Sequence, residues 1–245
     1  MKLHTLASLC IAAALAACAS PRGNALDGAS GEPRLRVAQA AVASGNLQLG
    51  ESIYASVSAA APSDTDVQLG YADVLVRLNK FHQAHSVLSD HLKTVKSPQL
   101  LCGPLGAIDV IQGEAARAIK EFDTAIAADH GNMRWVVDKA IALDMLSRHA
   151  DAQGLYSQAL AAEPDDVITI NNLALSLALS GQKTEATSIA SSLAGRSDLP
   201  ERVTLTYDVL RAADGENIST VRDTMGPGNY EHVLQLAKAI GGTEK

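Results

Sequence analysis

One spacing of 34 residues runs through most of this chain. It links the four alanines Ala84, Ala118, Ala152 and Ala186. Three further columns keep the same step: one of mostly bulky residues, one of small residues and one of residues common in turns. The bulky column holds Tyr54, Leu88, Phe122, Tyr156 and Ala190. The small column holds Ala38, Ala72, Gly106, Ala140 and Ala174. The turn column holds Gly45, Asn79, Gly113, Ser147 and Gly181. Several columns that share one period indicate a structural repeat, since alanine alone is abundant enough to align by chance.

A repeat of this length and pattern, with Pro62 and Pro164 closing two of the units, resembles the tetratricopeptide repeat (TPR). The resemblance covers about residues 31–224. It implies an all-α fold: a right-handed TPR α-solenoid of about five helix-turn-helix units, a degenerate sixth unit and a C-terminal capping helix. The units are expected to begin near Gly31, Thr65, Gln99, Met133, Val167 and Glu201. Small side chains would let paired helices approach closely, and the aromatic column would fill the space beside them.

Two stretches depart from the repeat. Cys102-Gly103-Pro104 places a glycine and a proline where a first helix should run, so we expect that helix to start late or to kink near Pro104. The sixth unit has Thr220 and Thr224 in the alanine and aromatic columns. Gly226-Pro227-Gly228 then stops it, and Asn229 caps a last helix that ends near Ile240. The solenoid is therefore expected over residues 32–240, with residues 241–245 as a disordered tail.

The N-terminus resembles a bacterial lipoprotein signal. Lys2 precedes an apolar run, Leu6–Ala17, that is too short for a membrane span. The run ends in Leu15-Ala16-Ala17-Cys18, which looks like the lipobox, so residues 1–17 are expected to be removed and Cys18 to be lipidated. An ordinary secretory signal with an accidental cysteine is the alternative. Residues 18–31 then form a lipidated N-terminus and flexible tether. Several acyl chains on Cys18 would give a stable anchor. In the lipoprotein family the residue after the cysteine sorts the protein, and Ala19 implies the outer membrane, facing the periplasm.

Composition narrows the classes of partner. The net charge is −7, which disfavours nucleic-acid binding, since phosphate neutralisation needs a basic face. Cys10 would leave with the signal and Cys18 would carry lipid, so Cys102 remains as one thiol, which we interpret as a buried small hydrophobe.

No constellation of residues favours catalysis. His82 and His85 stand three apart with His91 following, but no cysteine or carboxylate completes a metal set at ligand spacing. The chain has neither a phosphate-binding glycine loop nor a G-x-S-x-G elbow. We expect no catalytic residues, no metal and no cofactor. A metal-dependent enzyme that uses the His82/His85 cluster is a remote alternative.

Binding of a protein or peptide segment is the function that the resemblance implies. In TPR proteins the first helices line a concave groove through positions two, five, six, nine and twelve of each unit. The groove residues carried onto this chain are Asp73 of unit two, Arg134, Asp138 and Ile141 of unit four, and Asn171, Asn172 and Leu175 of unit five. The same positions also include Asp144. Adjacent asparagines resemble those that fix a peptide backbone or carboxylate by hydrogen bonds. The alternative is that Asn172 is merely a common residue of the repeat.

An acidic, lipid-anchored array of this size resembles the TadD family of tight-adherence (Flp-type) pilus assembly, and the segment Asn171–Gly181 carries that resemblance. It implies a non-enzymatic scaffold at the outer membrane that binds a protein partner during pilus or secretion-system assembly, such as a secretin or a pilus-assembly subunit. A TPR adaptor lipoprotein of cell-wall or outer-membrane assembly is the alternative.

Overall fold

The protein is helical throughout the part that the structure covers. The computed structural model describes residues 32–193, 195–196, 198–213, 215, 235, 237–238 and 240, and these residues include no strand. The helices are α2 (Glu32–Ala43), α3 (Leu47–Ala60), α4 (Thr65–Arg77), α5 (Phe81–Leu92), α6 (Gln99–Ile111), α7 (Ala115–Ala128), α8 (Met133–Met145), α9 (His149–Ala162), α10 (Val167–Leu179), α11 (Lys183–Ser191) and α12 (Glu201–Ala213). They divide into two compact units, an N-terminal unit up to His130 and a C-terminal unit from Gly131.

Several expectations fall on residues that are not described. They are the signal segment 1–17, Cys18 and the tether, the sixth-unit positions Thr220 and Thr224, the Gly226–Gly228 stop and the tail 241–245. Of the last helix expected from Asn229 to Ile240, only residues 235, 237–238 and 240 are described, and these are helical. None of the described helices is both long and apolar enough to cross a membrane.

The first helices begin where the 34-residue period predicts. Helices α4, α6, α8, α10 and α12 start at Thr65, Gln99, Met133, Val167 and Glu201. Aspartates support two of these starts, because Asp64 Oδ1 accepts from the backbone N–H of Asp66 and Asp166 Oδ2 accepts from that of Thr169. The period therefore sets the helix register from α4 to α12.

Each helix pair is closed by the same left-handed turn. The turn column has positive φ at all five positions, including the non-glycine residues Asn79 and Ser147, both at 59°. At each turn the backbone makes the two hydrogen bonds of a Schellman motif, as in Arg148 N–H to Leu143 O at 2.9 Å and Ser147 N–H to Asp144 O at 2.9 Å. Gly215, one further period along, has φ 86° at the end of α12. The first helix of the sixth unit thus ends as the others do.

The alanine and bulky columns form the cores of the helix pairs. All four alanines have 0 % exposure, and the bulky column is buried from Tyr54 at 5 % to Phe122 at 0 %. In the small column, position 106 has no room for a side chain, because a Cβ added to Gly106 would lie 2.9 Å from the Phe122 ring. Close approach of α6 and α7 therefore depends on that glycine.

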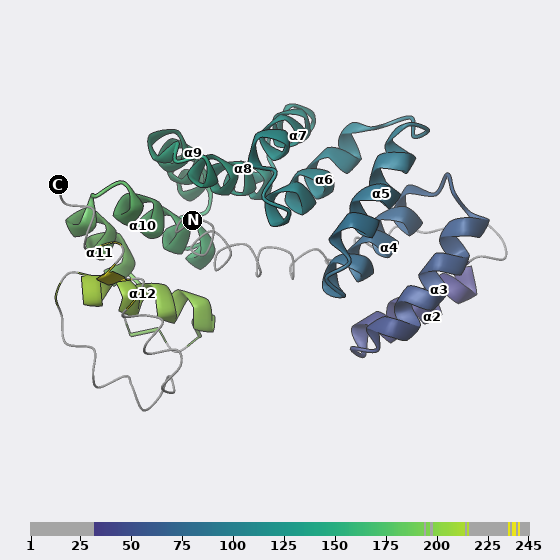
Figure 1. Cartoon of the computed structure of the whole chain (residues 1–245), viewed down its shortest axis with the longest axis horizontal. Helices are drawn as coiled ribbons and strands as arrows, with labels where there is room; N and C mark the ends of the chain where they lie inside the picture. The colour runs from purple at the N-terminus through teal and green to yellow at the C-terminus, as the bar shows by residue number, and fades with distance from the viewer. Residues whose placement is uncertain are drawn as a thin grey trace. The chain divides into compact units, whose positions relative to one another are not determined.

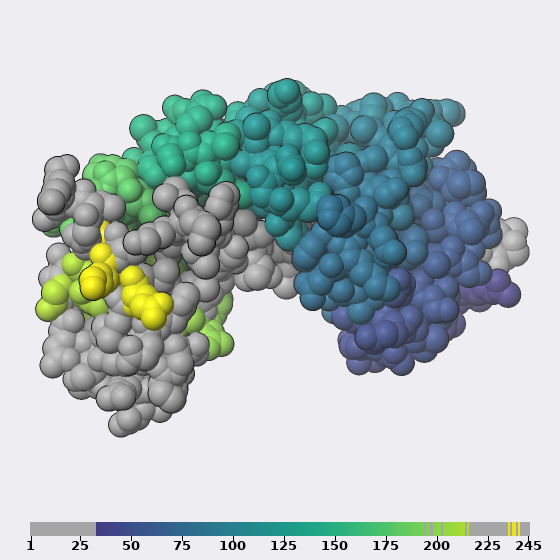
Figure 2. Space-filling model, viewed as in Figure 1, coloured from purple at the N-terminus to yellow at the C-terminus, as the bar shows by residue number. Residues whose placement is uncertain are grey.

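In the N-terminal unit each helix packs on the next along the chain, from α2 to α7 (Figure 1). One apolar cluster joins α2, α3 and α4 around Tyr54, and a second joins α4, α5 and α6 around Leu75 and Leu101. In Figure 2 the α2–α5 surface on the visible face is closely packed. The core is thus shared between neighbouring pairs, as stacking repeats require.

Helix α6 corrects one expectation. It starts at Gln99, in register with the other first helices, so the predicted late start is wrong. Pro104 lies inside the helix, where its ring removes one backbone donor. The preceding residue, Gly103, has no Cβ to clash with the proline ring, and this explains how the helical conformation is tolerated there.

In the C-terminal unit α8 pairs with α9, and α10 contacts α8, α9, α11 and α12. Ile170, Leu193 and Val203 form an apolar cluster between α10 and α12. Helix α10 is therefore the central helix of this unit, and Thr169 to Ala178 are all buried in it.

Candidate functional site

The predicted groove residues of units four and five lie on one face of α8 and α10. Arg134, Val137, Asp138 and Ile141 are spaced three or four apart along α8, and the equivalent residues of α10 are Ile168, Asn171, Asn172 and Leu175. This spacing aligns each set along one side of its helix. The two helices contact each other within the C-terminal unit. We call the two sets of residues the α8–α10 face.

Asp138 is the electrostatic centre of this face. The residue is 6 % exposed, and Oδ2 has no hydrogen-bond partner in the described part of the chain. Arg134 Nε is 3.6 Å from Oδ2, beyond hydrogen-bond distance, while its guanidinium lies 5.1 Å from the Trp135 ring centroid. Burial raises the pKa of Asp138 to about 6, although Arg134 opposes the shift. Asp138 is thus a carboxylate that Arg134 stabilises only in part.

The two asparagines supply a donor on α10. Asn171 is 5 % and Asn172 is 3 % exposed. Asn171 Nδ2 donates to Asn172 Oδ1 at 3.4 Å, which fixes the carbonyl end of the second amide. Asn172 Nδ2 is buried with no partner among the described residues. An amide donor and a carboxylate acceptor therefore stand unsatisfied at equivalent positions of neighbouring helices, and burying such groups costs free energy.

Apolar side chains surround these polar groups. Val137, Ile141 and Leu175 are buried at 9 %, 5 % and 7 % exposure. A few polar groups among apolar side chains are typical of a binding surface, where apolar contacts supply affinity and polar contacts fix orientation. The α8–α10 face has this composition.

Asp144, which occupies an expected groove position, joins three helices inside the C-terminal unit. Its carboxylate accepts hydrogen bonds from His149 Nδ1 at 2.8 Å, Tyr156 Oη at 3.0 Å and Ser176 Oγ at 2.7 Å. Burial raises the pKa of Asp144, and these hydrogen bonds oppose the shift. The donors come from α9 and α10, so Asp144 is a structural cross-link of α8, α9 and α10.

Asp73 is not part of the α8–α10 face. It lies on α4 in the N-terminal unit, where Arg77 Nη1 is 4.0 Å from its Oδ2. Six of the seven predicted groove residues therefore lie on α8 and α10 of the C-terminal unit, and the seventh lies on α4 of the N-terminal unit.

The histidine cluster does not converge on a metal site. His82 Nδ1 accepts from Gln112 Nε2 at 2.9 Å, and His85 lies between Ser89 Oγ at 3.1 Å and Asp109 Oδ1 at 3.3 Å. His91 Nε2 is 2.9 Å from Thr65 Oγ1. Within the described residues no group of three His, Cys, Asp or Glu side chains is placed to hold a metal. The two histidines of the alternative metal site are thus engaged with different partners.

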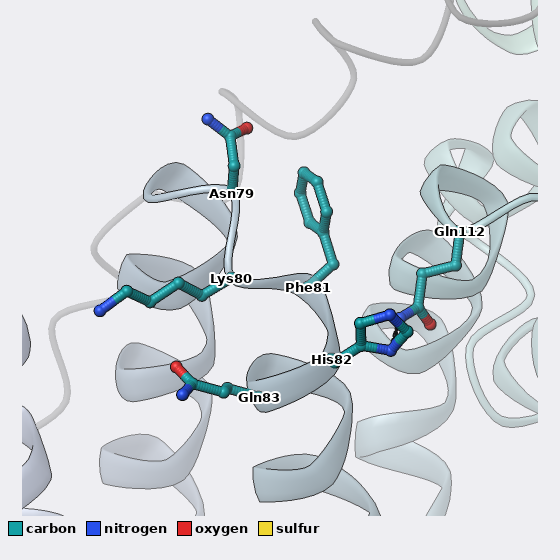
Figure 3. A pocket seen from close by; sticks show the side chains of 6 residues that line it. All are labelled: Asn79, Lys80, Phe81, His82, Gln83 and Gln112. Carbon is teal, nitrogen blue, oxygen red and sulfur yellow. Dashed lines mark hydrogen bonds between the residues drawn. The ribbon is translucent and has the colours of Figure 1, made fainter.

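His82 instead lines a depression of about 320 Å³ beside the α4–α5 turn. Figure 3 shows it between the α4–α5 turn and Gln112, with the Phe81 ring projecting and the His82–Gln112 hydrogen bond at its edge. Lys80 Nζ forms an ion pair with Glu51 Oε1 at 2.6 Å. With its charged residue already paired, the depression offers no convergent set of polar groups.

Cys102 is buried at 5 % exposure, as the sequence predicts. Burial, with Glu121 nearby, raises the pKa of its thiol to about 12. The thiol is therefore protonated and unreactive at neutral pH.

Two buried carboxylate clusters were not predicted from the sequence. Asp109, at 0 % exposure, accepts two hydrogen bonds of 2.6 Å from Arg117. It occupies a repeat column that holds Ala41, Leu75, Leu143 and Leu177 in the other four of the first five units. Asp144 likewise replaces the apolar Val76, Val110 and Ala178 of its own column. An aspartate in an apolar column is the signal that would have revealed both.

Comparison with solved structures defines the class of fold. A TPR protein from Parabacteroides merdae matches with a TM-score of 0.72 at 14 % identity, over 85 % of this chain and 84 % of that chain. The type IV pilus biogenesis factor PilW matches with a TM-score of 0.73 at 15 % identity, over 85 % and 98 %. PilF of Pseudomonas aeruginosa matches with a TM-score of 0.62 at 14 % identity, over 87 % and 93 %. The protein therefore has an α-solenoid fold of the TPR type.

Sequence comparison adds less. No protein-family model matches the chain. The uncharacterised protein y4yS of Sinorhizobium fredii is 36 % identical over 78 residues, which is 32 % of this chain and 43 % of that protein. The match thus spans less than half of the relative, and it supplies no function.

Proposed function

We propose that the protein is a non-enzymatic, lipid-anchored TPR scaffold that binds a protein partner during assembly of a pilus or a related secretion system at the outer membrane. The observation that carries the proposal is the α8–α10 face, where a buried acceptor on Asp138 and a buried donor on Asn172 lack partners among the described residues. Such groups are satisfied when a polypeptide supplies the missing hydrogen bonds.

The assembly role is supported by the structural similarity to PilW, which is described as a type IV pilus biogenesis factor and is matched over 98 % of its length. The sequence around Asn171 and Asn172 resembles the tight-adherence TadD family and favours that branch of pilus assembly. The α8–α10 face adds a surface suited to a peptide segment. Binding there requires no catalytic step.

The test is cross-linking of a C-terminally tagged protein in its native cells, followed by mass spectrometry. Recovery of a secretin or of pilus-assembly subunits is the expected result. Recovery of wall-modifying enzymes or of outer-membrane insertion machinery instead would overturn the pilus assignment in favour of an adaptor of cell-wall or outer-membrane assembly.

The anchor is tested separately. Lipidated Cys18 would insert several acyl chains together, which holds a protein on a membrane far more firmly than one myristoyl group does. We expect Cys18→Ala to move the protein from the membrane fraction to the soluble periplasmic fraction, whereas Cys102→Ala stays with the membranes. A Cys18→Ala protein that still sediments with the outer membrane contradicts the lipoprotein assignment.

A further inference from the structure

The α8–α10 face differs chemically from one that would hold a terminal carboxylate. Its deepest charged group is the acid Asp138, and α10 carries no titratable residue. Arg134, the basic residue of this face, has its guanidinium 5.1 Å from the Trp135 ring centroid and its Nε 3.6 Å from Asp138 Oδ2, a longer ion pair than a hydrogen-bonded one. A ligand carboxylate would therefore meet a carboxylate that is only partly neutralised, and like charges in a buried site repel.

A basic side chain fits the same position. An ammonium or guanidinium group would give Asp138 Oδ2 the hydrogen bond that it lacks, and a charge-assisted bond of this kind is about twice as strong as a neutral one. The apolar stem of a lysine or arginine would lie along Val137 and Ile141, both of which are apolar and flank Asp138 on α8.

Asn172 complements this acceptor with a donor. Its Oδ1 is already occupied by Asn171, so Nδ2 is the end that is left to a ligand. A backbone carbonyl is the acceptor that every peptide offers. Neighbouring helix axes lie about 8 to 10 Å apart, and an extended chain advances about 3.3 Å per residue. The carbonyl bound by Asn172 should thus lie roughly three residues from the basic residue.

We propose that the α8–α10 face binds an extended peptide segment through a lysine or arginine that pairs with Asp138, while Asn172 donates to a backbone carbonyl of the same segment. This inference rests on the proposed protein-binding function and adds the chemistry of the partner. Binding through Asp138 also gives a reason for a buried carboxylate that lowers stability, since recognition groups are commonly kept at such a cost.

The experiment is selection from a displayed library of random linear peptides on the full-length chain, immobilised through a C-terminal tag. Two variants are used in parallel. Asp138→Asn keeps the size of the side chain and removes its charge. Asp151→Asn is the matched control, since it removes a carboxylate of α9 that is 56 % exposed and paired with Arg148.

We expect the wild type and Asp151→Asn to enrich peptides with lysine or arginine at one fixed position, and Asp138→Asn to lose that preference. The enriched peptide with its basic residue replaced by glutamine should bind the wild type at least tenfold more weakly and bind Asp138→Asn with little change. Asn172→Leu should weaken all peptides while leaving the basic preference intact.

Two results would overturn the proposal, and only the second would also overturn the proposed protein-binding function. Enrichment of peptides without a basic residue, or a basic preference that survives in Asp138→Asn, would contradict the pairing with Asp138 and leave the protein-binding function standing. If no linear peptide is enriched on the wild type, the binding function fails, and this inference fails with it.

Discussion

At the scale of single residues, the burial of the Asp138 carboxylate lowers the stability of the folded chain. A carboxyl whose pKa is raised to about 6 binds its proton more tightly in the folded chain than in the unfolded chain. The free energy of unfolding therefore falls as the pH rises from about 4 to about 6, and the cost is fully present above that range.

Asp138→Asn should remove this cost. At pH 7.5 we expect the variant to be more stable than the wild type by up to roughly 3 kcal/mol, since each pKa unit corresponds to about 1.4 kcal/mol. Near pH 4 the two proteins should unfold at similar denaturant concentrations. Urea denaturation at both pH values measures this, with Asp151→Asn as the control that should show little change. A variant no more stable than the wild type at pH 7.5 would mean that Asp138 is well stabilised as an anion.

The turn residue Ser147 carries a strain that glycine would relieve. Its φ of 59° lies in the left-handed region, which costs an ordinary residue about 1 to 2 kcal/mol. Ser147→Gly loses part of this gain to chain entropy, so we expect a net stabilisation of about 0.5 to 1 kcal/mol. Gly113→Ala, at φ 82° in the same column, should destabilise by about 1 kcal/mol. Thermal melts that showed both changes with the same sign would contradict this account of the turn.

At the scale of elements, Asp144 links three helices of the C-terminal unit through hydrogen bonds. Ser176 is fully buried on α10 and donates to this carboxylate of α8 at 2.7 Å. A hydrogen bond to a charged group contributes about 1.5 to 3 kcal/mol, so Ser176→Ala should cost about 2 kcal/mol. Ser157→Ala, which removes an exposed hydroxyl of α9, should change little. Chemical denaturation compares the two, and equal midpoints would show that the bond is dispensable.

The sequence predicts most of the helical framework, because one period controls both where helices start and which residues are small. Thr65, Gln99, Met133, Val167 and Glu201 begin first helices as the repeat implies. Of the late start or kink expected at Pro104, the late start is wrong, since a repeat pattern cannot show that a glycine before the proline accommodates it.

The candidate site was predictable in part. Helical spacing brings Asp138 and Asn172 to equivalent positions of neighbouring units, and that follows from the repeat alone. The unsatisfied atoms, Asp138 Oδ2 and Asn172 Nδ2, could not be predicted from the repeat, because they depend on which side chains reach each other. Arg134 is four residues from Asp138 yet stays 3.6 Å away, and Asp144 turns to His149, Tyr156 and Ser176. Those outcomes require three-dimensional distances.

At the scale of the whole molecule, the same repeat position carries different chemistry in the two units. In the N-terminal unit the sixth position of successive first helices holds Arg36, Gly70 and Pro104, and in the C-terminal unit it holds Asp138, Asn172 and Thr206. At this sixth position, the side chains that form hydrogen bonds and carry no positive charge are therefore all in the C-terminal unit. We therefore place peptide recognition there.

Site-specific photo-cross-linking in native cells tests this placement most directly. A photoreactive amino acid would replace Ile168, a half-buried residue of the α8–α10 face, or Gln158, an exposed residue of α9. We expect a defined adduct from position 168 alone, mapped by mass spectrometry to a partner segment that contains lysine or arginine. Adducts from position 158 alone, or equally from both positions, would show that the partner does not bind at the α8–α10 face.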